Sequence, residues 1–222
     1  MAVITVSREY GSIGDDFGER VAHELGYHCV CKEFIGDLLA QYGLIEFERE
    51  YDSRPGFWNS LNKLGGERRS AVISMLNQVL QAVAQHGNVV IQGRSGFAAL
   101  QGFSDVLHVR LQAPLAVRVE RVAGQQRVTI EEAARIVKDG DAVRTGFVEG
   151  FYGVPWNSMH AFDLVLNTEK LASDVLVSWV VQAARGLEAQ QEGVGRSVRQ
   201  LQIDDVLAKA VATQLESAVG HC

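Results

Sequence analysis

The chain has 222 residues, of which 47% are hydrophobic and 22% charged, with a formal net charge of -6 at pH 7. This composition is typical of one medium-sized globular domain and does not favour nonspecific binding to nucleic acid or to anionic membranes. No apolar run reaches the roughly 18 residues of a membrane span. The three cysteines, Cys29, Cys31 and Cys222, lack metal-binding spacing, so we expect free thiols in a reducing cytoplasm.

Apolar runs alternate with segments of helical periodicity along most of the chain. The apolar runs predict strands at 2–6, 27–30, 89–91, 106–111 and 162–166. Helical spacing predicts helices at 15–25, 32–42, 68–85, from Pro114, from 129 toward 137, and at 172–187 and 203–219. Because strands that alternate with helices are typical of parallel sheets, the predicted fold class is a doubly wound α/β sheet.

Local signals mark several boundaries between these elements. Pro114 stands in the first-turn position that proline favours, and Thr129–Glu132 reads TIEE, a capping box. Residues 44–66 are polar and irregular, which predicts a helical insert outside the core. Residues 190–196 predict a linker. For the amphipathic helix predicted at 203–219, three roles are open: it packs on the domain, it mediates dimer contacts, or it begins a further module.

The stretch ITVSREYGSIGDDFGE near the N-terminus has the layout of a phosphate-binding loop: a strand, a glycine-containing turn and a helix. Because the first N–H groups of a helix lack partners, Gly11, Ser12 and Gly14 could form an anion-binding nest. The lysine and Ser/Thr of the usual motif are absent, and Gly14, Asp15 and Asp16 stand there instead. The alternative is an ordinary turn in which both aspartates stabilise the helix N-terminus.

Two charged residues of this stretch are further candidates. Asp16 occupies the Ser/Thr place of the motif and is the candidate ligand for Mg²⁺. Arg8 is the nearest cation and is the candidate replacement for the missing lysine. The alternatives are a helix-capping role for Asp16 and a surface or ion-paired arginine at position 8.

Three basic segments could contact phosphate groups. Gly93 and Arg94 follow a buried strand, where α/β sheets bind ligands, although such an arginine can also tie loops together. Asp141 and Arg144 are one helical turn apart in KDGDAVR and can act jointly on a phosphoryl group, unless they lie on an exposed, salt-bridged helix. Arg118 and Arg121 form a similar pair ahead of a candidate lid at 123–129.

Taken in order, five segments resemble the cytidylate kinase-like family, a branch of the P-loop nucleoside monophosphate kinases. They read SREYGS, VVIQGR, VLHVRLQAPLAVRVERV, EEAARIVKDGDAVRTGFVEGFYG and FDLVLNT, and the resemblance covers about residues 2–187. It implies a three-layer kinase fold in residues 1–188, with five parallel strands and helices on both faces. It also implies a nucleoside monophosphate-binding insert at 44–70 and a lid at about 122–140, followed by a linker and helix at 189–222.

The resemblance implies transfer of the γ-phosphoryl group of ATP, with Mg²⁺, to a nucleoside monophosphate, CMP or dCMP first among them. It assigns the phosphate loop to Ser7, Arg8, Gly11, Ser12, Ile13, Gly14, Asp15 and Asp16. It assigns catalytic roles to Arg94, Arg121, Asp141 and Arg144, and acceptor binding to Arg68, Arg69, Gly93, Arg94 and Asp141.

The chain departs from the cytidylate kinase pattern at several places. Asp15 stands where the kinase-like branch often has an arginine, and an arginine found shortly after the second strand is missing from FIGDLLAQYG. Gly14 replaces the loop lysine, Asp16 replaces a threonine, and Cys31 and Ser95 each replace an aspartate. Three functions therefore stay open: a nucleotide kinase, a non-catalytic nucleotide sensor on the same fold, and a structural interaction domain. The expected partners are small nucleotides, with a homodimer through the C-terminal helix as a further option.

Overall fold

Five parallel strands form one sheet in the order β2-β3-β1-β4-β5. The strands are β1 Val3–Arg8, β2 His28–Val30, β3 Val89–Gln92, β4 Val106–Gln112 and β5 Leu164–Asn167. This computed structural model describes residues 2–13, 16–43, 66–93, 95–190 and 195–217, without the side chains at 66–69. β1 lies at the centre, since Val3 pairs with Val89 on one side and with Val106 on the other. The predicted α/β fold class is confirmed.

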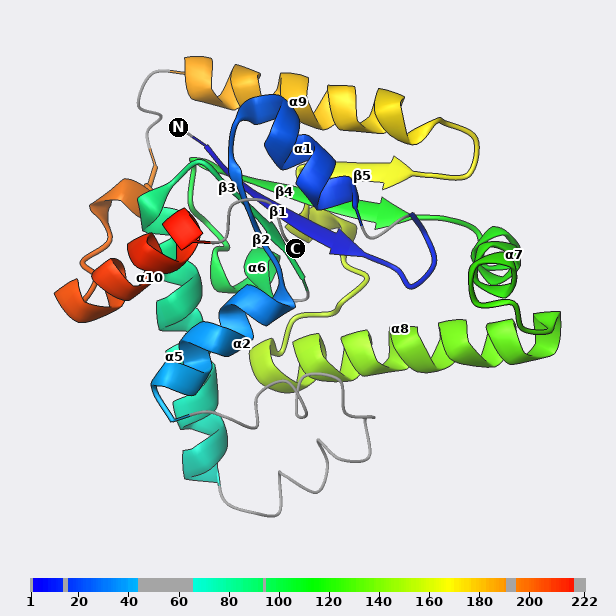
Figure 1. Cartoon of the computed structure of the whole chain (residues 1–222), viewed down its shortest axis with the longest axis horizontal. Coiled ribbons are helices and arrows are strands. Elements are labelled where there is room, and N and C mark those ends of the chain that lie inside the picture. The colour runs from blue at the N-terminus through cyan, green and yellow to red at the C-terminus, as the bar shows by residue number, and fades with distance from the viewer. Residues whose placement is uncertain (1, 14–15, 44–65, 94, 191–194, 218–222) are drawn as a thin grey trace.

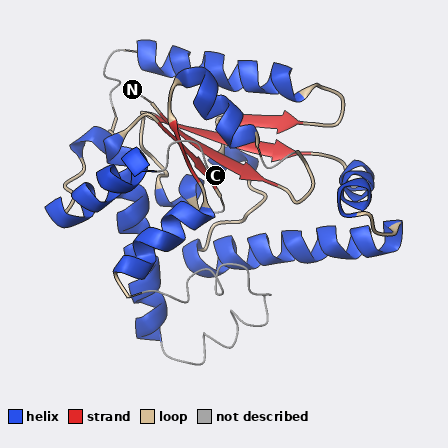
Figure 2. Cartoon of the chain, in the orientation of Figure 1, coloured by secondary structure: helices blue, strands red, loops and turns tan. Residues whose placement is uncertain are grey.

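Helices cover both faces of the sheet (Figures 1 and 2). They are α1 Phe17–Leu25, α2 Lys32–Gln41, α5 Gly66–His86, α6 Gly96–Ala99, α7 Leu115–Gln126, α8 Ile130–Tyr152, α9 Ser173–Ala189 and α10 Asp205–Ser217, with short 3₁₀ helices at Met159–Ala161 and Val198–Gln200. α1 and α9 lie on one face, and α2, α5, α6 and α10 lie on the other. The hairpin of α7 and α8 extends beyond the carboxyl ends of the strands.

The side chains of the central strands enter two separate cores. Ile4 and Val6 of β1 pack with α1 and α9, whereas Val3 packs with the core of α2 and α5. β4 is buried along nearly its whole length although its sequence alternates between apolar and polar residues. Helices cover both faces of a parallel sheet, so the polar positions of β4, His108 and Arg110, also become interior.

Several helix ends differ from the sequence prediction, among them ends of α1, α7 and α8. α1 begins at Phe17 rather than at 15, with Asp16 as its N-cap, and the Asp16 side chain makes no capping hydrogen bond. Pro114 is the residue before α7 rather than its first helical residue. Thr129 caps α8 as predicted, its hydroxyl accepting from the N–H of Glu132 at 3.2 Å, but the helix continues well past 137 to Tyr152.

The C-terminal helix packs on the domain, the first of its three predicted alternatives. Leu207, Val211 and Leu215 of α10 enter the core that α2 and α5 also form, and the Gln214 amide donates to the Phe34 carbonyl at 3.2 Å. Across the part of the chain that the structure describes, no helix is long and apolar enough to cross a membrane. The predicted insert at 44–66 falls almost entirely outside that part.

Candidate functional site

The loop between β1 and α1 is tightly held by its own backbone and by α7. The N–H and the hydroxyl of Ser12 both donate to the Glu9 carbonyl, at 3.2 and 2.8 Å. Gly11 has a φ of +75°, and a Cβ there would lie 2.8 Å from Val122 and 3.0 Å from the Arg118 carbonyl oxygen. The positive φ and the lack of space for a Cβ both require glycine at position 11, in agreement with the predicted glycine-containing turn. Gly14 and Asp15 lie outside the described residues.

The start of α1 is partly occupied by a side chain from β3. The Gly18 N–H donates to the Gln92 side-chain oxygen at 2.9 Å, so one N–H of the first turn already has an acceptor. Asp16 is exposed. The Ile13 side chain packs against the core formed with α1 and α9.

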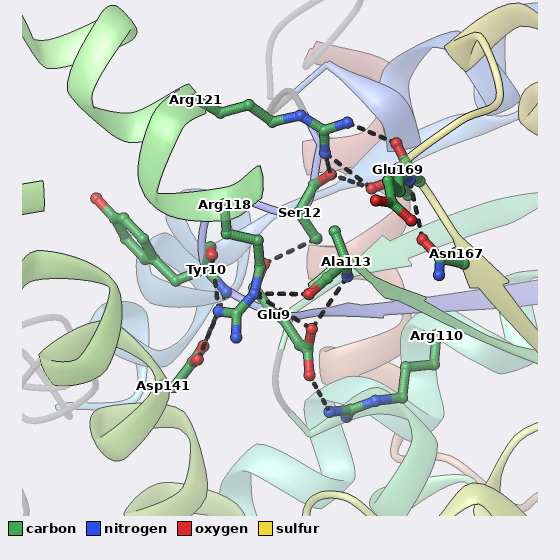
Figure 3. A network of polar contacts seen from close by, with 11 residues as sticks. Glu9, Tyr10, Ser12, Arg110, Ala113, Arg118, Arg121, Asp141, Asn167 and Glu169 are labelled. Atoms are coloured by element: carbon green, nitrogen blue, oxygen red, sulfur yellow. Dashed lines mark hydrogen bonds and ion pairs between the residues drawn. The ribbon is translucent and has the colours of Figure 1, made fainter. Parts of the chain in front are cut away.

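Arg118 of α7 is the buried centre of a polar network (Figure 3). Its side chain is 8% exposed and forms an ion pair with Asp141 at 2.6 Å and another with Glu9 at 3.4 Å. It also donates to the carbonyls of Ala113 and Tyr10, at 3.0 and 3.1 Å. One arginine therefore holds together the end of β4, the loop after β1 and helix α8.

Asp141 and Arg144 of α8 both face this loop, as their spacing predicts. The Asp141 carboxylate accepts the Tyr10 N–H at 2.9 Å in addition to its ion pair with Arg118. The Arg144 guanidinium lies 5.0 Å from the centre of the Tyr10 ring and donates to the Gly140 carbonyl at 2.9 Å. Both side chains are half-buried, and the ion pair of Asp141 reaches Arg118 of α7 rather than a residue of its own helix.

Arg121 joins the loop to the end of β5. It donates to the Ser12 carbonyl, and it donates to the Thr168 hydroxyl and carbonyl at 2.9 and 2.5 Å. The buried Thr168 hydroxyl donates to the same Ser12 carbonyl. The contacts that the structure gives to Arg121 are therefore neutral oxygens, which a phosphate group could replace.

Arg110 of β4 is a buried cation that the sequence reasoning did not select. It is 2% exposed, donates to the Trp156 carbonyl at 2.8 Å, and lies 4.3 Å from the centre of the Trp156 ring and 5.5 Å from that of Phe162. Its distance to the Glu9 carboxylate is 3.7 Å. Burial lowers the pKa of Arg110, and the charge of Glu9 opposes that shift. A charge on an apolar strand is the signal that could have identified it.

Three of the remaining predicted residues, Ser7, Arg8 and Gly93, lie at the carboxyl ends of β1 and β3. Ser7 is buried and Arg8 half-buried at the end of β1, and the Gly93 N–H donates to the Val6 carbonyl at 3.1 Å. Arg94 lies outside the described residues. Arg68 and Arg69 belong to the first turn of α5, without a described side chain. Glu9, Tyr10, Gln92 and Thr168 are further site residues that the sequence reasoning missed.

Comparison with known proteins shows the family. The family model described as the cytidylate kinase-like family matches residues 3–170. The cytidylate kinase of Methanopyrus kandleri is 32% identical over 82% of this chain and 92% of its own length, and that of Pyrococcus horikoshii is 27% identical over 82% and 87%. A crystal structure of an uncharacterized protein from Eubacterium ventriosum aligns with a TM-score of 0.63 at 13% identity, covering 83% of this chain and 99% of that one. The chain belongs to the cytidylate kinase-like family.

Proposed function

We propose that the protein transfers the γ-phosphoryl group of ATP to a nucleoside monophosphate, with CMP or dCMP as the first candidate acceptor. Family membership and the two cytidylate kinases of similar sequence support this reaction. The observation that carries it is the position of Asp141, which binds both the loop backbone at Tyr10 and the buried Arg118. The carboxyl end of the proposed lid, 122–140, therefore lies directly beside the proposed phosphate loop.

Phosphoryl transfer requires positioning and positive charge near the transferred group rather than covalent help from the protein. Arg118 is already neutralised by Glu9 and Asp141, so its role is to position the loop. Arg121 has neutral partners in the Ser12 carbonyl and Thr168, and moving it to a phosphate group breaks no described ion pair. We assign Arg121, together with Arg8, Arg94 and Arg144, the role of the missing loop lysine.

Mg²⁺ fits this site as an ion shared between protein and nucleotide. In the described ranges, no three His, Cys, Asp or Glu side chains gather into a group that could hold a metal. The Asp16 carboxylate is exposed at the start of α1 and is not used as a helix cap. Mg²⁺ commonly binds one or two carboxylates plus the phosphates of its substrate, so Asp16 is the candidate protein ligand. When bound, the ion would offset the charge of the phosphates.

Calorimetric titration with ATP, with and without Mg²⁺, tests nucleotide binding, and ADP release with each nucleoside monophosphate in turn tests transfer. We expect ATP to bind and one monophosphate to release ADP. Arg144→Ala and Arg94→Ala should each lower turnover by about a hundredfold, the effect of losing one positioned donor, without unfolding the protein. Arg185→Ala, on the exposed side of α9, is the control and should keep wild-type turnover. Wild-type rates in both the Arg94→Ala and the Arg144→Ala variants would refute the assignment.

A non-catalytic nucleotide sensor is the second candidate function. The start of α1 favours this function. The Gln92 side-chain oxygen already accepts the Gly18 N–H, and Asp16 stands where the usual motif has a serine or threonine. ATP binding without ADP release for any monophosphate would establish this function. Failure to bind ATP at all would instead favour a structural interaction domain.

A further inference from the structure

Ser7, Arg110 and Trp156 bring polar groups together at the carboxyl end of the sheet. Ser7 of β1 and Arg110 of β4 are register partners on neighbouring parallel strands, so their Cα atoms lie about 4.8 Å apart and their side chains leave the same face. Trp156 follows α8, and its ring lies against the Arg110 guanidinium. All three residues are buried, with exposures of 2%, 2% and 5%.

This cluster contains more hydrogen-bond donors than acceptors. Among the described residues, the Ser7 hydroxyl and the Trp156 Nε1 are buried without a hydrogen-bond partner. The Glu9 carboxylate is 3.7 Å from Arg110, beyond hydrogen-bond distance, and it is shared with Arg118 and with the Ala113 N–H. Burying such donors without acceptors is unfavourable, so a group that accepts from them would stabilise the cluster.

We propose that Ser7, Arg110 and Trp156 form an oxyanion subsite that binds the phosphate group of the acceptor. The planar guanidinium group of Arg110 matches the geometry of phosphate oxygens. The rings of Trp156 and Phe162 hold this group in its orientation. A buried arginine is usually neutralised by a carboxylate hydrogen-bonded to it, and Arg110 has no such hydrogen bond among the described residues. The fork is therefore held in place before a ligand arrives.

The subsite lies on the acceptor side of the proposed reaction, and this assignment rests on the proposed function. Ser7 precedes the loop at Glu9–Ser12, and its neighbour Val6 accepts the N–H of Gly93, the first residue of the predicted acceptor pair. The same face of the sheet is covered by α2 and α5, the two helices that flank the predicted acceptor-binding insert in the sequence. Arg121 instead joins Ser12 to Thr168 at the end of β5. Phosphate on Arg110 would accordingly belong to the acceptor rather than to ATP.

Arg110→Met separates a binding role from a structural one. Replacing a buried ion by an apolar side chain of similar length is often neutral or stabilising, so urea unfolding should show stability equal to or above that of the wild type. Inorganic phosphate at constant ionic strength should raise the melting temperature of the wild-type protein, and the variant should lose this shift. Its dissociation constant for CMP should rise at least tenfold while that for ATP stays unchanged.

Two further variants keep the test decisive if Arg110→Met does not fold. Ser7→Ala and Trp156→Phe each remove one unpartnered donor with little change in shape, and each should weaken phosphate and CMP binding several-fold. Arg185→Met on α9 is the matched control. A phosphate shift of wild-type size in all three subsite variants, or no shift in the wild-type protein, would overturn the subsite. Phosphate binding that depends on Arg110 without any ADP release would support the subsite and refute only the kinase reaction.

Discussion

Gly140→Ala would test whether helix α8 sets the position of the phosphate loop. An alanine Cβ at 140 would lie 2.6 Å from Cδ2 and 2.7 Å from Cγ of Tyr10, where ordinary contact begins at 3.4 Å. Alanine gains about 1 kcal/mol over glycine in a helix, whereas overpacking costs about 1–3 kcal/mol, so we expect a net loss of about 1 kcal/mol. The atoms in contact are at the base of the ring, which cannot turn away without moving the loop.

Gly124→Ala in the neighbouring helix α7 is the matched control. Among the described residues, no atom beyond the chain neighbours and the helix's own backbone lies within 4 Å of a Cβ at 124. This variant should therefore gain about 1 kcal/mol and differ from Gly140→Ala by about 2 kcal/mol in urea unfolding. Tyr10→Ala removes the ring, and in its background Gly140→Ala should become stabilising, which a double-mutant cycle reports as coupling. Equal stabilisation by both alanines in the wild-type background would refute the reasoning.

Three further predictions concern charge. Asp141→Asn leaves the buried Arg118 facing a neutral amide, so the free energy of unfolding should fall by about 2 kcal/mol. Glu120→Gln, at an exposed position of α7, is the control, and an equal loss in both variants would contradict the prediction. Burial lowers the pKa of His108, so the unfolded chain binds more protons below about pH 6.5 and stability should fall from pH 7 to 5. His108→Gln should flatten that slope; an unchanged slope would disprove the link. Burial and a glutamate hydrogen bond raise the pKa of Tyr27 to about 12, so phenolate absorbance should show a late component that Tyr27→Phe removes.

The order of strands and helices could be predicted from the sequence because each depends on local periodicity. The paired positions of Asp141 and Arg144 could also be predicted, since residues three apart on a helix share a face. The length of α8 could not, because the glycine at 140 lowers helix propensity and its reason is the Tyr10 ring, which is distant in sequence. Packing, rather than propensity, keeps the helix continuous there.

The partners of the charged residues could not be predicted from the sequence. Arg118 and Glu9 are separated by more than a hundred residues and meet only because β4 pairs with β1 in the sheet order. The burial of Arg110 likewise depends on β4 being an interior strand, since the same sequence at a sheet edge would leave the charge in water. Arg121 was predicted to face phosphate, and its position beside Ser12 became visible only in three dimensions.

If the end of the continuous helix α8 that packs in the main core serves as a pivot, the helix would work as a lever. Its last turns, at Phe147 and Val148, belong to the main core, whereas Val137 packs in a separate small core with α7. Rising 1.5 Å per residue, the helix places Gly140 about 10 Å and Ile130 about 25 Å from a pivot at Phe147. A tilt that shifts the Tyr10 contact by one ångström therefore displaces the outer end by about 2.5 Å. Small movements of the loop are amplified at the tip of the hairpin, where fluorescent labels would report them.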